Sequence, residues 1–142
     1  MKLTELLKHT DAIITCGDEP IDVSGISSSS KNIKQGYVFY ALKGTNVDGH
    51  KYIEDAVKAG AVAIVCENKP ENVSQNITIA ITKNCNDTYA QSAANWYDNP
   101  SNKLHLIGIT GTNGKTTTAT LLYELFNKAG IKAGLISLYS RL

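Results

Sequence analysis

The stretch LIGITGTNGKTTTATLL, residues 106–122, decides what kind of fold this sequence predicts. An apolar run comes first, a glycine-containing turn follows, and a lysine with three threonines opens an amphipathic segment. A strand, a glycine loop and a helix in this order form the context that a phosphate-binding P-loop requires. Backbone N–H groups of the loop, at the positive end of the helix, would then point at the phosphates of a nucleotide.

The predicted ATP site is a run of consecutive residues: Gly111, Thr112, Asn113, Gly114, Lys115, Thr116 and Thr117. Lys115 adds a positive charge for the phosphates, and the Thr116 hydroxyl is placed to ligate the Mg²⁺ that accompanies ATP. The generic pattern G-x-x-x-x-G-K-[ST] is incomplete, because Ile109 stands where its first glycine is expected. An ordinary glycine turn is the alternative, but it explains neither Lys115 nor the threonine pair. We therefore expect ATP and Mg²⁺ as cofactors.

Length and composition limit the classes of protein that this chain can represent. Its 142 residues, 42% hydrophobic and 19% charged, suit a folded domain, or a domain and a piece of a second one. A net charge of +1 gives no electrostatic basis for binding nucleic acid or an anionic membrane. Charged residues interrupt the N-terminal apolar runs, so neither a signal peptide nor a membrane span is expected. We expect a cytoplasmic monomer, and three widely spaced cysteines suit a reducing compartment.

Hydrophobic periodicity predicts an α/β fold. Helices are expected at residues 2–9, 51–61, 86–97 and 115–129, and strands at residues 21–27, 37–42, 62–66, 77–82, 104–110 and 132–138. The helix at 86–97 is expected to begin with Asn86 or Asp87 as its cap and to turn Tyr89, Ala93, Trp96 and Tyr97 inward. The polar cluster DNPSNK contains Pro100 and breaks the chain. This division predicts a domain over residues 1–99, a linker at 100–103 and the start of a second domain at 104–142.

Residues 104–142 read as one βαβ unit, the opening of a parallel sheet. The helix expected there carries an apolar stripe of Leu121, Leu122, Leu125, Phe126 and Ala129, and Gly130 is expected to end it. One such unit cannot cover both faces of its sheet. We therefore expect this part to be an incomplete domain, with exposed apolar faces and the lower stability of the two.

The loop GITGTNGKTTTATLL closely resembles the ATP loop of the Mur ligase family, whose cytoplasmic ATP-dependent enzymes add amino acids to UDP-N-acetylmuramate in peptidoglycan synthesis. The segment ISSSSKNIKQGYVFYALKGTNVDGHKYIEDAVKAGAVAIVCE resembles the first domain of one branch of that family. That branch adds the third residue, L-lysine or meso-diaminopimelate, to UDP-N-acetylmuramoyl-L-Ala-D-Glu through an acyl phosphate. The resemblance implies a mixed-sheet α/β UDP-binding domain followed by the first βαβ unit of a P-loop ATP-binding domain.

The resemblance also implies substrate-binding residues in the N-terminal part. Ser30 and Lys31 match family positions that hold the UDP moiety, and the uridine contacts of the family fall on Thr45, Asn46 and Val47. Ser29 stands where the family has aspartate, and Lys31 where it has arginine. Those two departures remove a bidentate contact or an internal salt bridge. From composition alone, SSSSK reads as a polar loop.

Three short motifs receive structural interpretations. Asp48 and Gly49 are expected to form a turn followed by a helix cap. His50 is expected to be a surface residue at the helix start rather than a catalyst, because no paired acid or nucleophile is visible nearby. The tetrapeptide DNPS at 98–101 is similar to an amino-acid-selecting motif of the family but lacks its arginine, and we interpret it as a linker turn.

No catalytic residue is assigned in this chain, because the resemblance places the carbamylated lysine and the acidic and histidine Mg²⁺ ligands further along. We therefore expect an N-terminal portion of a ligase that is inactive by itself. Two alternatives stay open. One is a fragment of another ligase of the superfamily, either the enzyme that adds D-Ala-D-Ala or a folyl-polyglutamate type, and the other is a non-catalytic nucleotide-binding protein.

Overall fold

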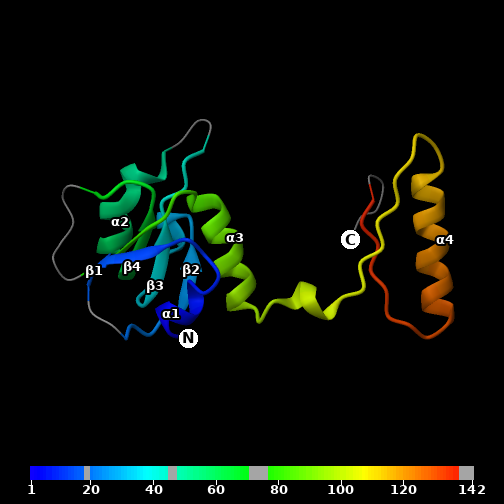
Figure 1. Ribbon diagram of the computed structural model, residues 1–142, viewed down its shortest axis with the longest axis horizontal. Coiled ribbons are helices and arrows are strands. Elements are labelled where there is room, and N and C mark those ends of the chain that lie inside the picture. Colours follow the sequence, from blue (N-terminus) through cyan, green and yellow to red (C-terminus); the bar gives the residue numbers. More distant parts are fainter. Residues whose placement is uncertain (18–19, 45–47, 71–76, 138–142) are drawn as a thin grey trace. The chain divides into compact units, whose positions relative to one another are not determined.

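The computed structural model describes residues 1–17, 20–44, 48–70 and 77–137 (Figure 1). Its internal contacts divide the chain into two units, Met1–Lys103 and Leu104–Leu142. Each unit is described here by itself.

A five-stranded sheet forms the centre of the first unit. Its strands are β1 (Ile13–Cys16), β2 (Gly25–Ser27), β3 (Tyr37–Tyr40), β4 (Ala61–Cys66) and β5 (Thr78–Ile81). They lie in the order β1-β5-β4-β3-β2, with β2 to β5 parallel and β1 antiparallel to β5. The mixed α/β sheet predicted from the sequence is confirmed. β1 was not predicted, although its Ile-Ile-Thr run has the β-branched residues typical of a strand.

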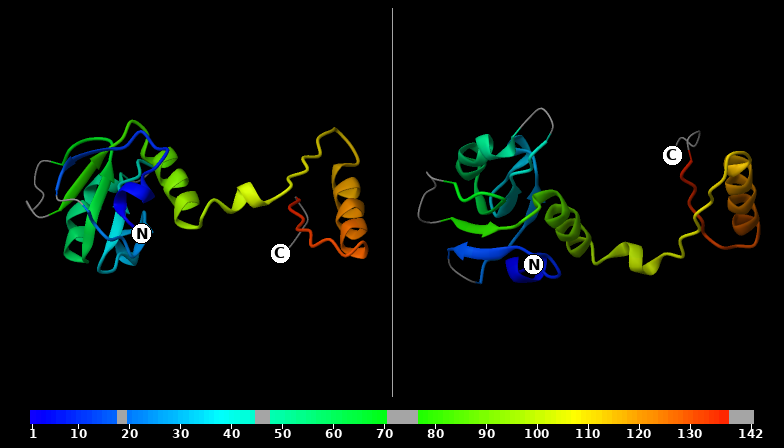
Figure 2. Two further views of the ribbon diagram at one scale, coloured as in Figure 1. Left: turned by 60° about the horizontal axis from the view of Figure 1, so that its bottom comes forward. Right: turned by 45° about the horizontal axis from the view of Figure 1, so that its top comes forward.

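Helices cover both faces of this sheet. The first unit contains α1 (Leu3–Leu6), α2 (Ile53–Lys58) and α3 (Cys85–Trp96), with three 3₁₀ turns, η1 (Ser30–Asn32), η2 (Gly49–Tyr52) and η3 (Pro100–Lys103). α1 and α3 contact one another on one face, and α2 packs on the other, as Figure 2 shows. The three helices expected in this region are present, and the first two are shorter than predicted.

β3 shows how the sequence fills the two resulting cores. Val38 and Tyr40 face α1 and α3, whereas Phe39 and Ala41 face the side of α2, and all four side chains are at most 1% exposed. Successive side chains of a strand point to opposite faces. Because both faces are covered, the strand reads as a continuous apolar run rather than an alternating one.

α3 differs from its prediction at its start and on its buried face. Asn84 is the N-cap, and its side-chain oxygen accepts hydrogen bonds from the backbone N–H groups of Asn86 and Asp87. The cap expected at Asn86 or Asp87 was therefore wrong by two or three residues. The residues buried along the helix are Cys85, Thr88, Ser92 and Asn95, while Tyr97 is 71% exposed. Tyr89 and Trp96 pack against the core as expected.

Asn95 is a polar residue of α3 that is buried because it makes hydrogen bonds to another element. Its Nδ2 donates to the backbone oxygens of Leu6 and Lys8, at 2.9 and 2.7 Å. These carbonyls lie at the end of α1, where helical carbonyls have no partner within their own helix. Burial of the amide is favourable because it satisfies those carbonyls.

The described residues of the second unit, 104–137, contain one regular element, α4 (Lys115–Lys128). It ends at Gly130, whose φ of 79° is left-handed, and Ile131 N–H donates to Phe126 O at 2.9 Å. The predicted helix and its end are confirmed. The strands predicted at 104–110 and 132–138 are wrong within the described residues, since none of residues 104–137 is assigned to a strand. A strand requires a neighbour that receives its hydrogen bonds, and no such ladder forms here.

Candidate functional site

Two glycines shape the loop that precedes α4. Gly114 is the N-cap residue of α4 and has a φ of 77°, while Gly111 has a φ of 149°. A residue with a side chain is strained at the φ of Gly114. Lys115 therefore begins the helix directly after a sharp turn, and the first backbone N–H groups of α4 have no acceptor within the helix.

The side chain of Lys115 folds back over this loop. Its Nζ donates hydrogen bonds to the backbone oxygens of Gly111 and Thr112, the latter at 3.3 Å. Thr116 is the second residue of α4, and its backbone oxygen accepts a hydrogen bond from Thr120 Oγ1 at 2.9 Å. Thr116 is half-buried and Thr117 is exposed. The predicted residues 111–117 thus form one loop and the first helical turn, with an ammonium group on the same side as the loop carbonyls.

A second candidate site lies at one edge of the sheet in the first unit. Because β2 to β5 are parallel, their carboxyl ends share this edge. The segments that follow these strands bring polar residues there: Ser28 to Lys31 after β2, Asp48 and His50 after β3, Glu67 after β4 and Thr82 to Asn84 after β5. Ligands of α/β proteins commonly bind outside the carboxyl ends of parallel strands.

Ser30 and Lys31 are the first two residues of η1 at this edge. Ser27 holds the preceding turn, since its hydroxyl accepts from Ser29 N–H and donates to Ser29 O, both at 3.0 Å. Ser30 is half-buried and Lys31 is exposed. The remaining predicted substrate residues, at 45–47, lie outside the described residues.

Asp48, Gly49 and His50 form a tight turn at the same edge. Asp48 Oδ1 accepts hydrogen bonds from His50 N–H at 3.0 Å and pairs with His50 Nδ1 at 2.7 Å. The hydrogen bond from the His50 backbone is the largest cause of a lowered pKa of the Asp48 carboxyl, and the contact with the His50 ring is the next largest. The predicted turn and cap are confirmed, because Asp48 is the N-cap of η2.

Gly49 fits this turn because it lacks a side chain. Its N–H donates to Leu42 O at 2.8 Å, and a Cβ would lie 2.6 Å from that oxygen. The close approach ties η2 to the residues just after β3. Any larger residue would have to displace backbone.

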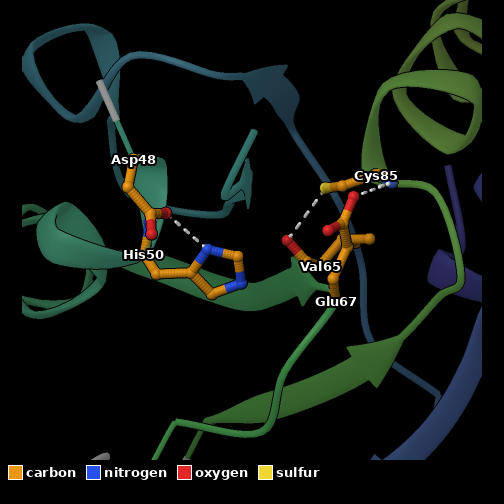
Figure 3. A network of polar contacts seen from close by, with 5 residues as sticks. All are labelled: Asp48, His50, Val65, Glu67 and Cys85. Atoms are coloured by element: carbon orange, nitrogen blue, oxygen red, sulfur yellow. Dashed lines mark hydrogen bonds and ion pairs between the residues drawn. The ribbon is translucent and has the colours of Figure 1, made fainter. Parts of the chain in front are cut away.

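His50 is not the surface residue that the sequence predicted. Its side chain is only 19% exposed, and its Nε2 is covered and has no hydrogen-bond partner within the described part of the chain. Figure 3 shows the imidazole ring turned toward the Asp48 carboxylate. Periodicity could not have revealed this burial, because it arises where η2 folds back against α2 and the residues just after β3.

Glu67 and Cys85 form a separate polar contact near this ring (Figure 3). Glu67 Oε1 accepts from Cys85 N–H at 3.1 Å, and Cys85 Sγ donates to Val65 O at 3.4 Å. Burial raises the pKa of the Cys85 thiol to about 12. Since the thiolate is the nucleophilic form of cysteine, Cys85 is a structural residue.

Asp11 is a further residue at this edge that the sequence analysis missed. Its carboxylate accepts hydrogen bonds from the Thr82 hydroxyl, from Lys83 N–H at 3.1 Å and from Thr88 Oγ1 at 3.3 Å. These contacts, that from Thr82 first, lower the pKa of Asp11. Asp11 also borders a cleft of about 560 Å³ that Glu67 and Lys83 help to line. No local sequence pattern marks Asp11, because the threonine hydroxyls that it binds lie more than seventy residues further along the chain.

No group of three or more His, Cys, Asp or Glu side chains in the described ranges could hold a metal ion. Among the described helices, none has the length and apolar character needed to cross a membrane.

A mostly parallel sheet with helices on both faces places the first unit in the class of α/β folds. Comparison with known families is more specific. The model for "Mur ligase family, catalytic domain" matches residues 22–109, and that for "Mur ligase middle domain" matches residues 109–140. The chain therefore belongs to the Mur ligase family, as its loop sequence predicted.

Two of the most similar curated relatives have the same name. "UDP-N-acetylmuramoyl-L-alanyl-D-glutamate--2,6-diaminopimelate ligase" of Phocaeicola vulgatus is 45% identical over 96% of this chain, and its namesake in Clostridium tetani is 43% identical over 96%. The chain spans about 28% of the length of each of these relatives. Among solved structures, MurF from Acinetobacter baumannii has a TM-score of 0.59 and 23% identity, and the match covers 88% of this chain and 27% of that one. This likeness supports the fold alone.

Proposed function

We propose that these residues belong to an ATP-dependent ligase that joins 2,6-diaminopimelate to UDP-N-acetylmuramoyl-L-Ala-D-Glu in peptidoglycan synthesis. The observation that carries the proposal is the 45% identity to a ligase of that name over 96% of this chain, which includes both units. In this proposal residues 1–99 anchor the UDP moiety, residues 100–103 are a linker, and residues 104–142 begin the ATP-binding domain. L-Lysine is the alternative amino acid, and the names of the relatives favour diaminopimelate.

The loop before α4 suits the phosphates of ATP. The backbone N–H groups of the first turn are free to bind anionic oxygens at the positive end of the helix. Lys115 would exchange its bonds to the loop carbonyls of Gly111 and Thr112 for bonds to phosphate oxygens. The Thr116 hydroxyl would ligate Mg²⁺ together with the nucleotide, as a hard oxygen ligand does.

ATP supplies the phosphoryl group that activates the substrate carboxylate toward the incoming amine. Such chemistry depends on positioning and on neutralising the charge of the transferred group. Lys115 provides that positive charge in this chain. In the first unit, Ser30 and Lys31 would hold the UDP moiety, the hydroxyl by hydrogen bonding and the ammonium by its charge on the diphosphate. The predicted contacts from Thr45, Asn46 and Val47 remain part of the proposal.

Calorimetric titration of residues 1–142 tests the two binding sites separately. We expect Lys115→Ala to weaken Mg·ATP binding by about tenfold or more, because a charged hydrogen bond is lost, and to leave UDP binding unchanged. Lys31→Ala should weaken UDP binding and spare Mg·ATP. Lys128→Ala, at the other end of α4, is the matched control for charge. If Lys115→Ala binds Mg·ATP as tightly as the unsubstituted chain does, the loop is not the ATP site.

Residues 1–142 alone are not expected to ligate. The described residues gather no cluster of acidic or histidine side chains that could hold the catalytic Mg²⁺. Incubation with UDP-N-acetylmuramoyl-L-Ala-D-Glu, Mg·ATP and radiolabelled diaminopimelate should therefore give no labelled tripeptide. Appearance of that product would contradict this part of the proposal.

A further inference from the structure

The Nε2 atom of His50 is a buried polar atom without a hydrogen-bond partner among the described residues of the first unit. Nε2 is covered and makes no hydrogen bond to any residue that the structure describes, while Nδ1 of the same ring is paired with Asp48 at 2.7 Å. Buried polar atoms are paired in the great majority of cases, and each exception calls for a reason. A binding residue that meets its partner only in the complex is one such reason.

The contact with Asp48 determines what Nε2 can recognise. An ionised carboxylate only accepts hydrogen bonds, so Nδ1 must carry the proton that it shares with Asp48. In a neutral ring, Nε2 then presents a lone pair and accepts a hydrogen bond. Its partner must therefore be an N–H or O–H group.

The position of His50 places this acceptor at the candidate substrate edge. Gly49 N–H binds Leu42 O, two residues after β3, and thereby holds η2 at the carboxyl end of the sheet. η1, which carries Ser30 and Lys31, follows the neighbouring strand β2, and both turns contact α2. About one fifth of the His50 side chain is exposed, so the ring reaches the surface of the first unit at this edge.

We propose that His50 is a further substrate-binding residue, whose Nε2 accepts a hydrogen bond from the nucleoside part of the UDP substrate. This inference rests on the proposed function, because it takes the UDP moiety to bind at this edge. Uridine offers two kinds of donor, the N3–H group of uracil and the hydroxyls of ribose. Asp48 is a positioning residue that fixes the ring and its tautomer.

Two substitutions separate the two ring nitrogens. Asparagine places an amide near the position of Nδ1 and so keeps the contact with Asp48, whereas glutamine reaches the position of Nε2. We expect His50→Asn to weaken UDP binding about fivefold at about pH 8 while the thermal midpoint falls by less than about 2 °C. His50→Gln should weaken UDP binding less than His50→Asn does. Both are measured on residues 1–142 by calorimetric titration and thermal unfolding.

The outcomes distinguish this inference from the proposed function. If the unsubstituted chain does not bind UDP, both fail. If the unsubstituted chain binds UDP and His50→Asn binds it equally well, the role of Nε2 is refuted and the proposed function stands. The same conclusion follows if His50→Gln weakens UDP binding as much as His50→Asn does. A purely structural role would lower the thermal midpoint of His50→Asn by several degrees together with its affinity, and that result would also overturn the inference.

Two UDP analogues identify the donor. 3-Methyluridine 5′-diphosphate lacks the N3–H group, and 2′,3′-dideoxyuridine 5′-diphosphate lacks both ribose hydroxyls. The fivefold penalty of His50→Asn should vanish with one of them, because the hydrogen bond that the substitution removes is then already absent. A penalty that persists with both analogues would overturn the inference.

Discussion

The first unit buries a core on both faces of its sheet, whereas none of the described residues of the second unit is buried. Both units have helices with apolar residues at helical spacing. Leu6 of α1 is 0% exposed, while Leu125 of α4 is 60% exposed. An apolar stripe therefore predicts that a helix can form, and only a second surface decides whether that stripe becomes a core.

The same contrast applies to the two candidate sites. The loop before α4 takes its shape from local features, namely two glycines with positive φ and a lysine that binds carbonyls three and four residues away. The carboxyl edge of the sheet takes its shape from residues far apart in the chain, such as Asp11 and Thr82. A site of the first kind can be read from a sequence motif, and one of the second kind cannot.

The largest difference between the units should appear in amide hydrogen exchange. Amides of β4, in the middle of the sheet, should exchange only on global unfolding, which costs about 5–15 kcal/mol in a domain of this kind. Amides of α4 belong to a 14-residue helix without a buried face, and such helices are marginal in water. We expect protection factors about 10³-fold or more higher in β4, measured by NMR. Equal protection in the two units would refute the contrast.

The next largest difference should appear in the free energy of unfolding when one leucine in each unit is replaced by alanine. Leu6→Ala removes a side chain with no exposed surface and should lower the free energy of unfolding by about 2–5 kcal/mol. Leu125→Ala, the matched substitution in α4, should change it by less than about 0.5 kcal/mol. Urea unfolding followed by the fluorescence of Trp96 measures this, because Trp96 is the single tryptophan and packs on the core of the first unit. If both substitutions lowered the free energy of unfolding by similar amounts, the result would show that α4 packs on a core.

The strands show how far the sequence alone could predict the first unit. The apolar runs that became β3 and β4 were predicted because both of their faces are buried. β1 was missed because it is only four residues long and mostly exposed, and its antiparallel partner β5 lies more than sixty residues away in the sequence. The segments at 104–110 and 132–137 have the apolar character of strands but no ladder partner, and local sequence cannot reveal that difference.

The errors in α3 have the same origin. Asn84, Asn86 and Asp87 are all good cap residues, and the end of β5 rather than local preference selects Asn84. Asn95 is buried because the carbonyls of α1 need its amide, and those carbonyls lie almost ninety residues away in the sequence. Within the candidate substrate edge, His50 was read as a surface residue for a similar reason. Its burial depends on how η2 packs against α2 and the residues after β3.

The pH dependence of stability provides the smallest and most specific contrast between the units. The hydrogen bonds from Thr82, Lys83 and Thr88 lower the pKa of Asp11 in the folded state. A carboxyl whose folded-state pKa is lowered contributes stability above its ordinary pKa, and this contribution is lost as the pH falls through the acidic range. The contribution is modest because the carboxyl is exposed.

We therefore expect Asp11→Asn to unfold at a lower urea concentration than the unsubstituted chain at neutral pH, with a difference that shrinks toward about pH 3. Trp96 fluorescence at a series of pH values measures it. Glu124→Gln in α4 is the matched control, and it should leave the midpoint unchanged at every pH because α4 adds nothing to the core that Trp96 reports. A pH-independent difference for Asp11→Asn would mean that Asp11 acts through the shape of its contacts rather than through its charge. An effect of Glu124→Gln on the Trp96 transition would mean that the two units unfold as one.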